Sequence, residues 1–291
     1  MRVWGRRDFL AAVGSVCGVL KGAALGSRYS ALGEGHSAGA RQLGTIGIQL
    51  YTVRDDLRRD PEGTLVKIAA IGYKEVEFAG YPMSSVKALR ALLDRLGLSA
   101  PSGHVDVRAM REDWTRTLEA AAELGQHYVA CAGLPAEERQ TLDQYRRFGA
   151  LFDRAGEAAR QAGLQLCYHN HDFEFTHIEG RLPFDVLLEA TDPRLVQLEL
   201  DLYWITKGDQ DPLAYFRRYP GRFPLVHVKD MDRSAARGFT EVGRGVINFK
   251  RIFARAEEAG IRHYFYEQDS TPGSPFESAR VSYEYLRKVQ F

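Results

Sequence analysis

Short apolar runs alternate with longer amphipathic segments from about residue 44 to the end of the chain. The short runs contain many β-branched and aromatic residues, which favours strands, and the longer segments repeat apolar residues with helical spacing. Several of the longer segments close on a glycine, as helix C-termini do. The expected strands lie at 45–51, 73–78, 98–104, 127–133, 164–171, 196–202, 224–230 and 263–269, and the expected helices at 64–72, 85–97, 114–125, 145–163 and 249–260.

This order of elements predicts an α/β fold. Eight strands that alternate with helices over roughly 250 residues have the size and rhythm of a (β/α)₈ TIM barrel. We therefore expect a single TIM-barrel domain over residues 44–291. A doubly wound open sheet is the alternative, but no glycine-rich phosphate loop follows the first expected strand.

The amino terminus has a different pattern. The pair Arg6-Arg7 precedes Asp8-Phe9-Leu10 and an apolar stretch of small residues, which is typical of a bacterial twin-arginine signal. The stretch is too short and too rich in glycine for a transmembrane helix. We expect a signal peptide at 1–26, a linker at 27–43, and a periplasmic or secreted protein without stable membrane insertion after cleavage. An uncleaved anchor or a disordered tail is the alternative.

The net charge argues against nucleic-acid binding, and the cysteines are expected to be free. The chain has 39 basic and 38 acidic residues, and removal of residues 1–26 takes away four basic residues and one acidic residue, which leaves 35 against 37. A nearly neutral chain has no strong electrostatic attraction to nucleic acid. Cys131 and Cys167 lie in strand-like runs, so we expect buried free thiols.

The ends of the last four expected strands carry metal-binding chemistry. In a TIM barrel, residues of one parity along each strand point inward, and the last of them line the active-site mouth. Strands five to eight end on that parity in His169, Asp201, His227 and Glu267. Any one of them could be solvated, cap a helix or form an ion pair, but burying four together unpaired is costly. Imidazoles and carboxylates suit Mn, Co, Fe or Zn, so we predict these four as ligands of a divalent metal ion.

Other polar residues near the strand ends have a functional and a structural interpretation. His171 shares the parity of His169 and is an acid–base candidate or a turn residue, and Lys229 could hold a substrate oxygen or pair with a carboxylate such as Glu199. The predicted catalytic set is therefore His169, His171, Lys229 and Glu267. Substrate contacts are expected from strand ends and adjoining loops, namely from Gln49, Tyr51, Glu77, His104, Trp204 and Glu241.

Six stretches carry a family resemblance: "GIQLYTVRD", "YHNHDFEF", "ELDLYWITKGDQDP", "VHVKDMD", "EVGRGVINF" and "YEQD". With them the chain, from about Thr45 onward, resembles the xylose-isomerase-like TIM barrels, which include sugar phosphate isomerases/epimerases, inosose dehydratases and class II AP endonucleases. The resemblance implies metal ligands Glu, Asp, His and Glu on strands five to eight. The last three correspond to Asp201, His227 and Glu267, whereas the first falls on His169. Glu174 is the other candidate for the missing carboxylate.

The resemblance implies a divalent-metal-dependent sugar or keto-sugar isomerase/epimerase that abstracts a proton next to a carbonyl. A His-x-His on strand five is similar to the inosose dehydratases, so a lyase or dehydratase on a keto-sugar, keto-glycoside or inosose is the alternative. Export favours an unphosphorylated sugar as the small-molecule partner, and a homo-oligomer is compatible with the sequence. Two other classes are a non-catalytic sugar-binding barrel and an AP-endonuclease-like nuclease. The nuclease needs a trinuclear site and a basic face, neither of which the sequence indicates.

Overall fold

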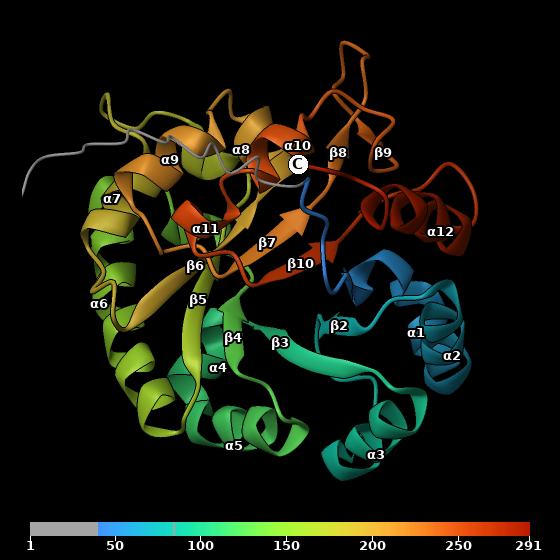
Figure 1. The fold of residues 1–291 in the computed structure, drawn as a ribbon. Helices are drawn as coiled ribbons and strands as arrows, with labels where there is room; N and C mark the ends of the chain where they lie inside the picture. Colours follow the sequence, from blue (N-terminus) through green and yellow to red (C-terminus); the bar gives the residue numbers. More distant parts are fainter. Residues whose placement is uncertain (1–39, 84) are drawn as a thin grey trace, which may run out of the picture. The chain divides into compact units, whose positions relative to one another are not determined.

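Eight parallel strands close into a barrel with helices around it (Figure 1). The structure is a computed structural model that describes residues 40–83 and 85–291. The predicted signal peptide and most of the predicted linker lie outside the described residues. The strand order around the barrel is β1-β10-β7-β6-β5-β4-β3-β2, and every neighbouring pair is parallel. The predicted TIM-barrel fold is thereby confirmed.

The barrel strands lie within or close to the predicted ranges, and most are shorter. Their bounds are β1 Gly47–Gln49, β2 Glu75–Phe78, β3 Ser99–Val105, β4 Tyr128–Cys131, β5 Gln165–His169, β6 Val196–Asp201, β7 Leu225–Val228 and β10 His263–Tyr266. Most of the residues that were predicted as strand but lie outside the strands are at the carboxyl ends, where the chain enters the loops of the barrel mouth. His171 thus follows β5 and Lys229 follows β7 instead of lying inside them.

The helices cover the outside of the barrel (Figure 1). All five expected helices are present, and the segment 249–260 is divided into two helices by Ala254 and Arg255. Gly97, Gly125 and Gly260 end helices in the left-handed conformation that the closing glycines predict. The bounds are α1 Arg54–Arg59, α2 Pro61–Ile71, α3 Val86–Leu96, α4 Val107–Glu112, α5 Trp114–Leu124, α6 Leu142–Gln161, α7 Pro183–Glu189, α8 Leu202–Lys207, α9 Pro212–Arg218, α10 Phe249–Phe253, α11 Ala256–Ala259 and α12 Pro275–Leu286, with 3₁₀ helices η1 Leu50–Val53, η2 Ala136–Glu138 and η3 Phe173–Phe175.

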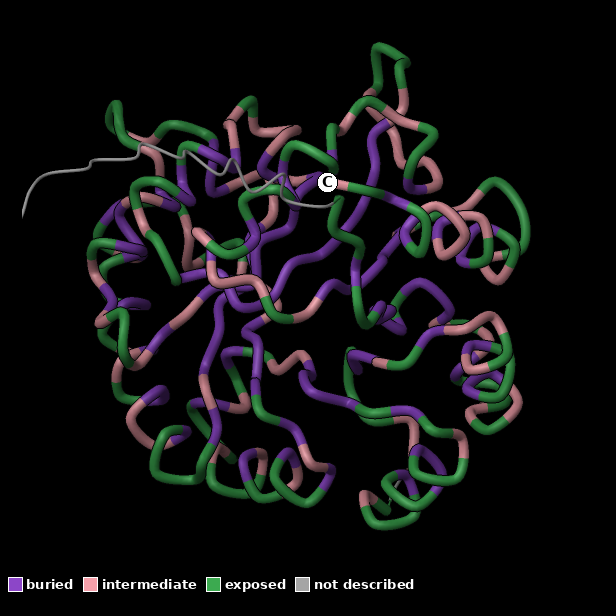
Figure 2. The backbone as a smooth tube through the Cα atoms, viewed as in Figure 1, coloured by how far each residue is buried: buried purple, intermediate pink, exposed green. Residues whose placement is uncertain are grey.

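Burial follows the layers of the fold: the strands and the inward faces of the helices are buried, and the outer helix faces are exposed (Figure 2). A separate apolar cluster fills the inside of the barrel, made of Tyr128, Ala130, Cys167, Leu225 and Phe265. Two residues further along three of these strands, at the same parity, the inward side chains become polar. The apolar cluster therefore forms the floor beneath a polar mouth.

Both predicted cysteines are buried free thiols, as expected from the sequence. Beyond β7 the chain forms a small antiparallel hairpin, β8 Asp230–Met231 and β9 Phe239–Thr240. In the part of the chain that the structure describes, no helix is both long enough and apolar enough to cross a membrane.

Candidate metal centre

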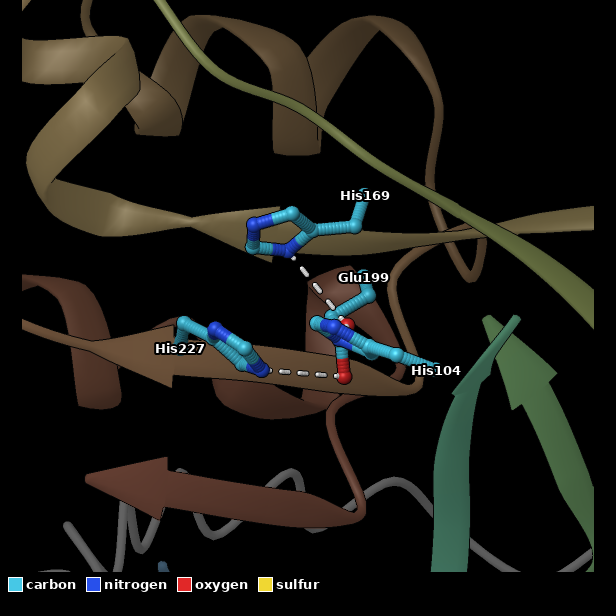
Figure 3. Close-up of side chains that lie close together, drawn as sticks. All are labelled: His104, His169, Glu199 and His227. Carbon is cyan, nitrogen blue, oxygen red and sulfur yellow. Dashed lines mark hydrogen bonds and ion pairs between the residues drawn. The ribbon is translucent and has the colours of Figure 1, made fainter. Parts of the chain in front are cut away.

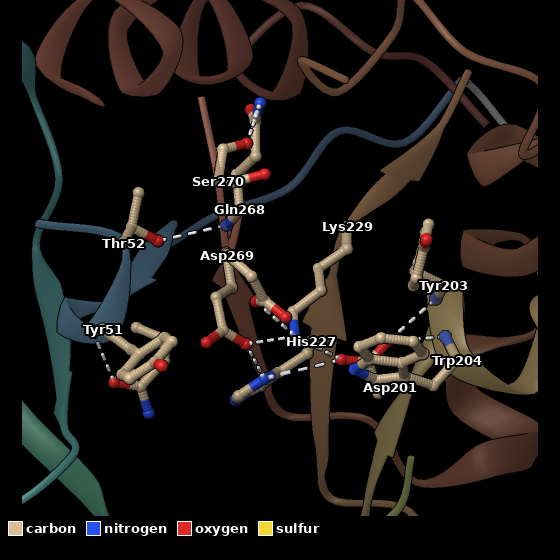
Figure 4. A network of polar contacts seen from close by, with 12 residues as sticks. Tyr51, Thr52, Asp201, Tyr203, Trp204, His227, Lys229, Gln268, Asp269 and Ser270 are labelled. Atoms are coloured by element: carbon tan, nitrogen blue, oxygen red, sulfur yellow. Dashed lines mark hydrogen bonds and ion pairs between the residues drawn. The ribbon is translucent and has the colours of Figure 1, made fainter. Parts of the chain in front are cut away.

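One group of metal-binding side chains lies at the carboxyl ends of β6, β7 and β10. Asp201, His227 and Glu267 place ligand atoms within 4.8 Å of one another, and we call them the outer group. His227 Nδ1 is 2.7 Å from Glu267 Oε2 and 3.9 Å from Asp201 Oδ2. The other Asp201 oxygen caps α8 by accepting hydrogen bonds from the backbone N–H groups of Tyr203 and Trp204 (Figure 4). Helix capping thus fixes the Asp201 carboxylate through Oδ1 and leaves Oδ2 for contacts within the site.

Lys229 extends from the end of β7 into the carboxylates of this group (Figure 4). Its Nζ lies 3.0 Å from Asp201 Oδ2, 2.7 Å from Glu267 Oε2 and 2.9 Å from Asp269 Oδ1. The side chain is buried, so this ammonium is held by ion pairs that solvent screens weakly. Burial opposes its charge, but the three carboxylates outweigh burial and raise the Lys229 pKa well above its ordinary value.

A second group lies deeper in the barrel and shares His227. It contains His104, His169, Glu199 and His227, whose ligand atoms also lie within 4.8 Å of one another (Figure 3). Glu199 Oε2 is 2.7 Å from His104 Nε2 and 3.3 Å from His169 Nδ1, and Glu199 Oε1 is 3.4 Å from His227 Nε2. We call His104, His169 and Glu199 the inner group.

Glu77 from β2 supports both groups from the side. Its Oε2 is 2.6 Å from His227 Nε2 and 3.4 Å from His104 Nε2, and it accepts a hydrogen bond of 2.9 Å from Gln49 Nε2. The Gln49 amide oxygen is itself engaged by the Tyr51 backbone N–H. Gln49 and Glu77 therefore hold imidazoles in place behind the cavity.

Burial among these carboxylates sets different protonation states for neighbouring histidines. Burial lowers the pKa of His169 well below its ordinary value, and together with the Lys229 ammonium it lowers the His171 pKa to about 3. For His227 burial acts in the same direction, but Glu199 and the other carboxylates outweigh it and raise the pKa. His169 and His171 are therefore neutral at pH 7, and neutral imidazole can accept a proton or bind a metal.

Buried polar atoms without hydrogen-bond partners indicate that the site suits a divalent cation. Within residues 40–83 and 85–291, the buried atoms that make no hydrogen bond include Glu77 Oε1, His169 Nδ1 and Glu199 Oε1, while Asp201 Oδ2 is paired with the Lys229 ammonium. Buried polar atoms without partners are costly, and a cation bound to carboxylates and imidazoles removes that cost. The chemistry of the donor set is that of Mn, Co, Fe or Zn sites.

A cavity of about 450 Å³ opens above the two groups. The predicted catalytic residues His169, His171, Lys229 and Glu267 all line it, together with Tyr51, His104, Asp106 and Asp269. Lys229 is the one lysine or arginine among the described residues that line this cavity. Four acid–base side chains thus surround a space that can hold a small molecule.

Other predicted residues lie outside this lining. Trp204 lies beside the cavity, with its ring 5.7 Å from the His171 ring and 5.5 Å from Lys229 Nζ. Glu241 instead accepts a hydrogen bond of 3.0 Å from Ser278 on α12. Glu174 accepts from the Tyr168 hydroxyl and the His171 backbone N–H, so its carboxylate is engaged away from both metal-binding groups.

Glu199 and Asp269 lie in the site but are not among the residues predicted from the sequence. Glu199 stands two residues before Asp201 on the inward face of β6, so strand parity could have identified it. Asp269 lies beyond the end of β10, where no periodicity fixes side-chain direction. Of the four predicted ligands, the outer group contains three, and His169 belongs to the inner group.

The fold and the site together define a TIM barrel with a candidate divalent-metal centre at the carboxyl ends of its strands. The family model of the xylose isomerase-like TIM barrel matches residues 65–289. The chain therefore belongs to the xylose isomerase-like TIM barrel family.

Inosose dehydratases and a sugar phosphate isomerase/epimerase are among the relatives of the chain. The chain is 31% identical over 165 residues to an inosose dehydratase of Lacticaseibacillus casei, a match that spans 55% of that relative and 50% of this chain. It is 27% identical over 266 residues to an inosose dehydratase of Geobacillus kaustophilus, covering 86% of that protein and 77% of this chain. A solved sugar phosphate isomerase/epimerase from Parabacteroides distasonis is 30% identical, with a TM-score of 0.74 over 86% of this chain and 95% of the other.

Proposed function

We propose that the protein is a divalent-metal-dependent lyase that removes a proton next to the carbonyl of a keto-sugar or inosose and expels a β-hydroxyl or alkoxyl group. The proposal is carried by one observation, the presence of different acid–base groups around a single cavity. His171 supplies a neutral imidazole and Lys229 supplies a buried ammonium. A base and a separate proton donor are the requirements of β-elimination.

The cation is proposed to bind to Asp201, His227 and Glu267. When bound there, a divalent cation supplies a Lewis acid that polarises a carbonyl and raises the acidity of the neighbouring C–H bond. Asp201 is held for this role by its cap on α8, and His227 by its Nε2 contact with Glu77. Burial excludes water from these three side chains, which strengthens their electrostatic interactions.

The protein groups then move two protons. His171, whose side chain lines the cavity, accepts the proton from the carbon next to the carbonyl. The electron pair of that C–H bond forms a double bond to the β-carbon, and the β-C–O bond breaks. Lys229 Nζ gives its proton to the departing oxygen, so that water or an alcohol leaves. Proton exchange with solvent then returns both residues to their starting states.

The substrate is proposed to be unphosphorylated. A phosphate group in a protein site is usually held by arginines, lysines or a helix N-terminus. Lys229 is already paired with three carboxylates, so it is a poor phosphate ligand. The twin-arginine pattern supports the same proposal, because an exported enzyme meets few sugar phosphates. The carbohydrate and its location are both part of the proposal.

An isomerase or epimerase is the second candidate, because the Glu267 carboxylate lines the same cavity as the histidines. It would share the first proton transfer and return the proton to carbon. The solved isomerase/epimerase relative from Parabacteroides distasonis favours this candidate.

Product analysis separates the two candidates. The Mn²⁺-loaded protein is incubated in D₂O with a panel of unphosphorylated keto-sugars, keto-glycosides and inososes, and the products are followed by NMR and mass spectrometry. Loss of water or alcohol from the substrate is expected. A product of unchanged composition, with deuterium at a new position or on the opposite face, would instead establish isomerisation or epimerisation. No reaction with any member would leave a sugar-binding barrel as the better account.

A further inference from the structure

The inner group has its own set of metal ligands, separate from the outer group. His104, His169 and Glu199 come from β3, β5 and β6, and Glu199 lies two residues before Asp201. At about 3.3 Å per strand residue, that spacing places Glu199 about 6.6 Å before Asp201 along the strand, and therefore deeper in the barrel. Distances of 2.7 Å and 3.3 Å join Glu199 Oε2 to the two imidazole nitrogens. Such separations suit neighbouring ligands of one cation, whose bonds to nitrogen and oxygen are about 2.0–2.2 Å long.

The two nitrogens of His227 face different groups. Nδ1 lies 2.7 Å from Glu267, and Nε2 lies 2.6 Å from Glu77. A neutral imidazole has one lone pair and one N–H, so His227 can bind an outer cation through Nδ1 while Nε2–H donates to Glu77. The inner group of His104, His169 and Glu199 is then complete without His227, and Glu77 Oε1 remains without a hydrogen-bond partner among the described residues.

The charge of the region exceeds what one cation neutralises. Five carboxylates surround the groups, and Lys229 is the ammonium that pairs with three of them. Five ionised carboxylates and one ammonium leave four negative charges when the histidines are neutral metal ligands. A single divalent cation compensates half of that charge, and two compensate all of it. In the absence of a cation, burial opposes charge on His104 and His227, but the carboxylates outweigh burial and raise their pKa, so these imidazoles carry part of the compensating charge. The five carboxylates are Glu77, Glu199, Asp201, Glu267 and Asp269.

We propose that His104, His169 and Glu199, with Glu77 beside them, bind a second divalent cation of the Mn, Fe, Co or Zn class. The inference rests on one part of the proposed function, the assignment of the first cation to the outer group. His104 and His169 also line the cavity, so the second cation would border the substrate. It would neutralise Glu199 and fix the imidazoles that form this part of the wall.

Cobalt binding to the metal-free protein tests the proposal without any substrate. The full chain is stripped of metal with a chelator, and Co²⁺ is then titrated in equilibrium dialysis and by visible absorption. The wild type is compared with His104→Gln and Glu199→Gln for the inner group and with Asp201→Asn for the outer group. His263→Gln is the matched control, because His263 pairs with Glu75 at 2.9 Å at the opposite end of the barrel. Circular dichroism verifies that each variant is folded.

The wild type and the control are expected to bind two equivalents. His104→Gln and Glu199→Gln should retain one and weaken the other by at least about 100-fold, because the loss of even an outer-shell partner costs about 10–100-fold in affinity. Asp201→Asn should instead weaken binding of the cation at the outer group and leave the cation at the inner group bound. One equivalent in the wild type, unchanged in His104→Gln, would overturn the second site and leave the proposed function intact. One equivalent that disappears in His104→Gln but persists in Asp201→Asn would overturn the outer assignment instead.

Discussion

Glu174 is a buried carboxylate whose ionisation should limit the stability of the protein at high pH. It is fully buried and accepts hydrogen bonds from the Tyr168 hydroxyl and the His171 backbone N–H. Burial raises its pKa from 4.5 to about 7. Because the folded state holds this proton more tightly than the unfolded state, the carboxyl group stabilises the fold fully below pH 4.5 and loses that contribution as the pH rises through 7.

The variant Glu174→Gln removes this titration and keeps the shape of the side chain. Its amide oxygen can accept from His171 N–H, and its amide nitrogen can donate to the Tyr168 hydroxyl oxygen. A shift from 4.5 to about 7 corresponds to about 3 kcal/mol, at about 1.4 kcal/mol per pH unit. Relative to wild type, the variant should therefore gain about 3 kcal/mol in free energy of unfolding between pH 4.5 and the range above pH 7.

Urea unfolding over a series of pH values measures this gain. Each value is a difference between variant and wild type, so titrations common to both proteins cancel. Glu123→Gln on the exposed face of α5 controls for the substitution itself. A difference between Glu174→Gln and wild type that stays constant across the pH range would refute the argument that burial holds the proton on Glu174.

Two further predictions concern the lysine of the site and a glycine of the loop after β9. Lys229→Met removes the proposed proton donor, so turnover on the substrate found in the panel should fall by about 10²–10⁴-fold, while His263→Gln stays near wild type in the same assay. Retained turnover in Lys229→Met would remove Lys229 from the mechanism. Gly243 has φ +91°, and a Cβ at this position would lie 2.3 Å from the Tyr285 ring. A strained backbone alone costs about 1–3 kcal/mol, so Gly243→Ala, which adds the clash, should lower the free energy of unfolding by more than that. Gly80→Ala, at φ +90° in open space, should show the strain alone in urea unfolding, and equal losses in the two variants would contradict the steric argument.

The fold can be predicted well from the sequence because the patterns that indicate it lie within short segments of the chain. Alternating apolar runs, amphipathic segments and helix-closing glycines give the order of elements, and a (β/α)₈ barrel is the natural closure of eight such units. Parity along the strands also brings Asp201, His227 and Glu267 together at the barrel mouth. Each of these residues stands at the end of a strand whose inward and outward positions the neighbouring residues determine.

The rest of the site depends on long-range packing. His104 meets Glu199 across the barrel at a separation of 95 residues, and no local pattern reports that contact. Parity places Glu199 inward, but only the closed barrel shows that it meets imidazoles instead of the apolar floor. Glu241 was predicted to contact the substrate. In the structure, Gly243 and Gly245 donate to Asp230 instead, which directs Glu241 toward α12.

The central claim is that a divalent cation held by Asp201, His227 and Glu267 is required for proton removal next to a carbonyl. The most direct test is deuterium incorporation from D₂O into the panel of keto-sugars and inososes, with chelator-stripped protein and with the same protein after addition of Mn²⁺ or Co²⁺. Exchange that is lost on stripping, restored by the metal and absent in His227→Ala is the predicted result. Exchange at an undiminished rate in the stripped protein, or with full metal loading in His227→Ala, would contradict the account.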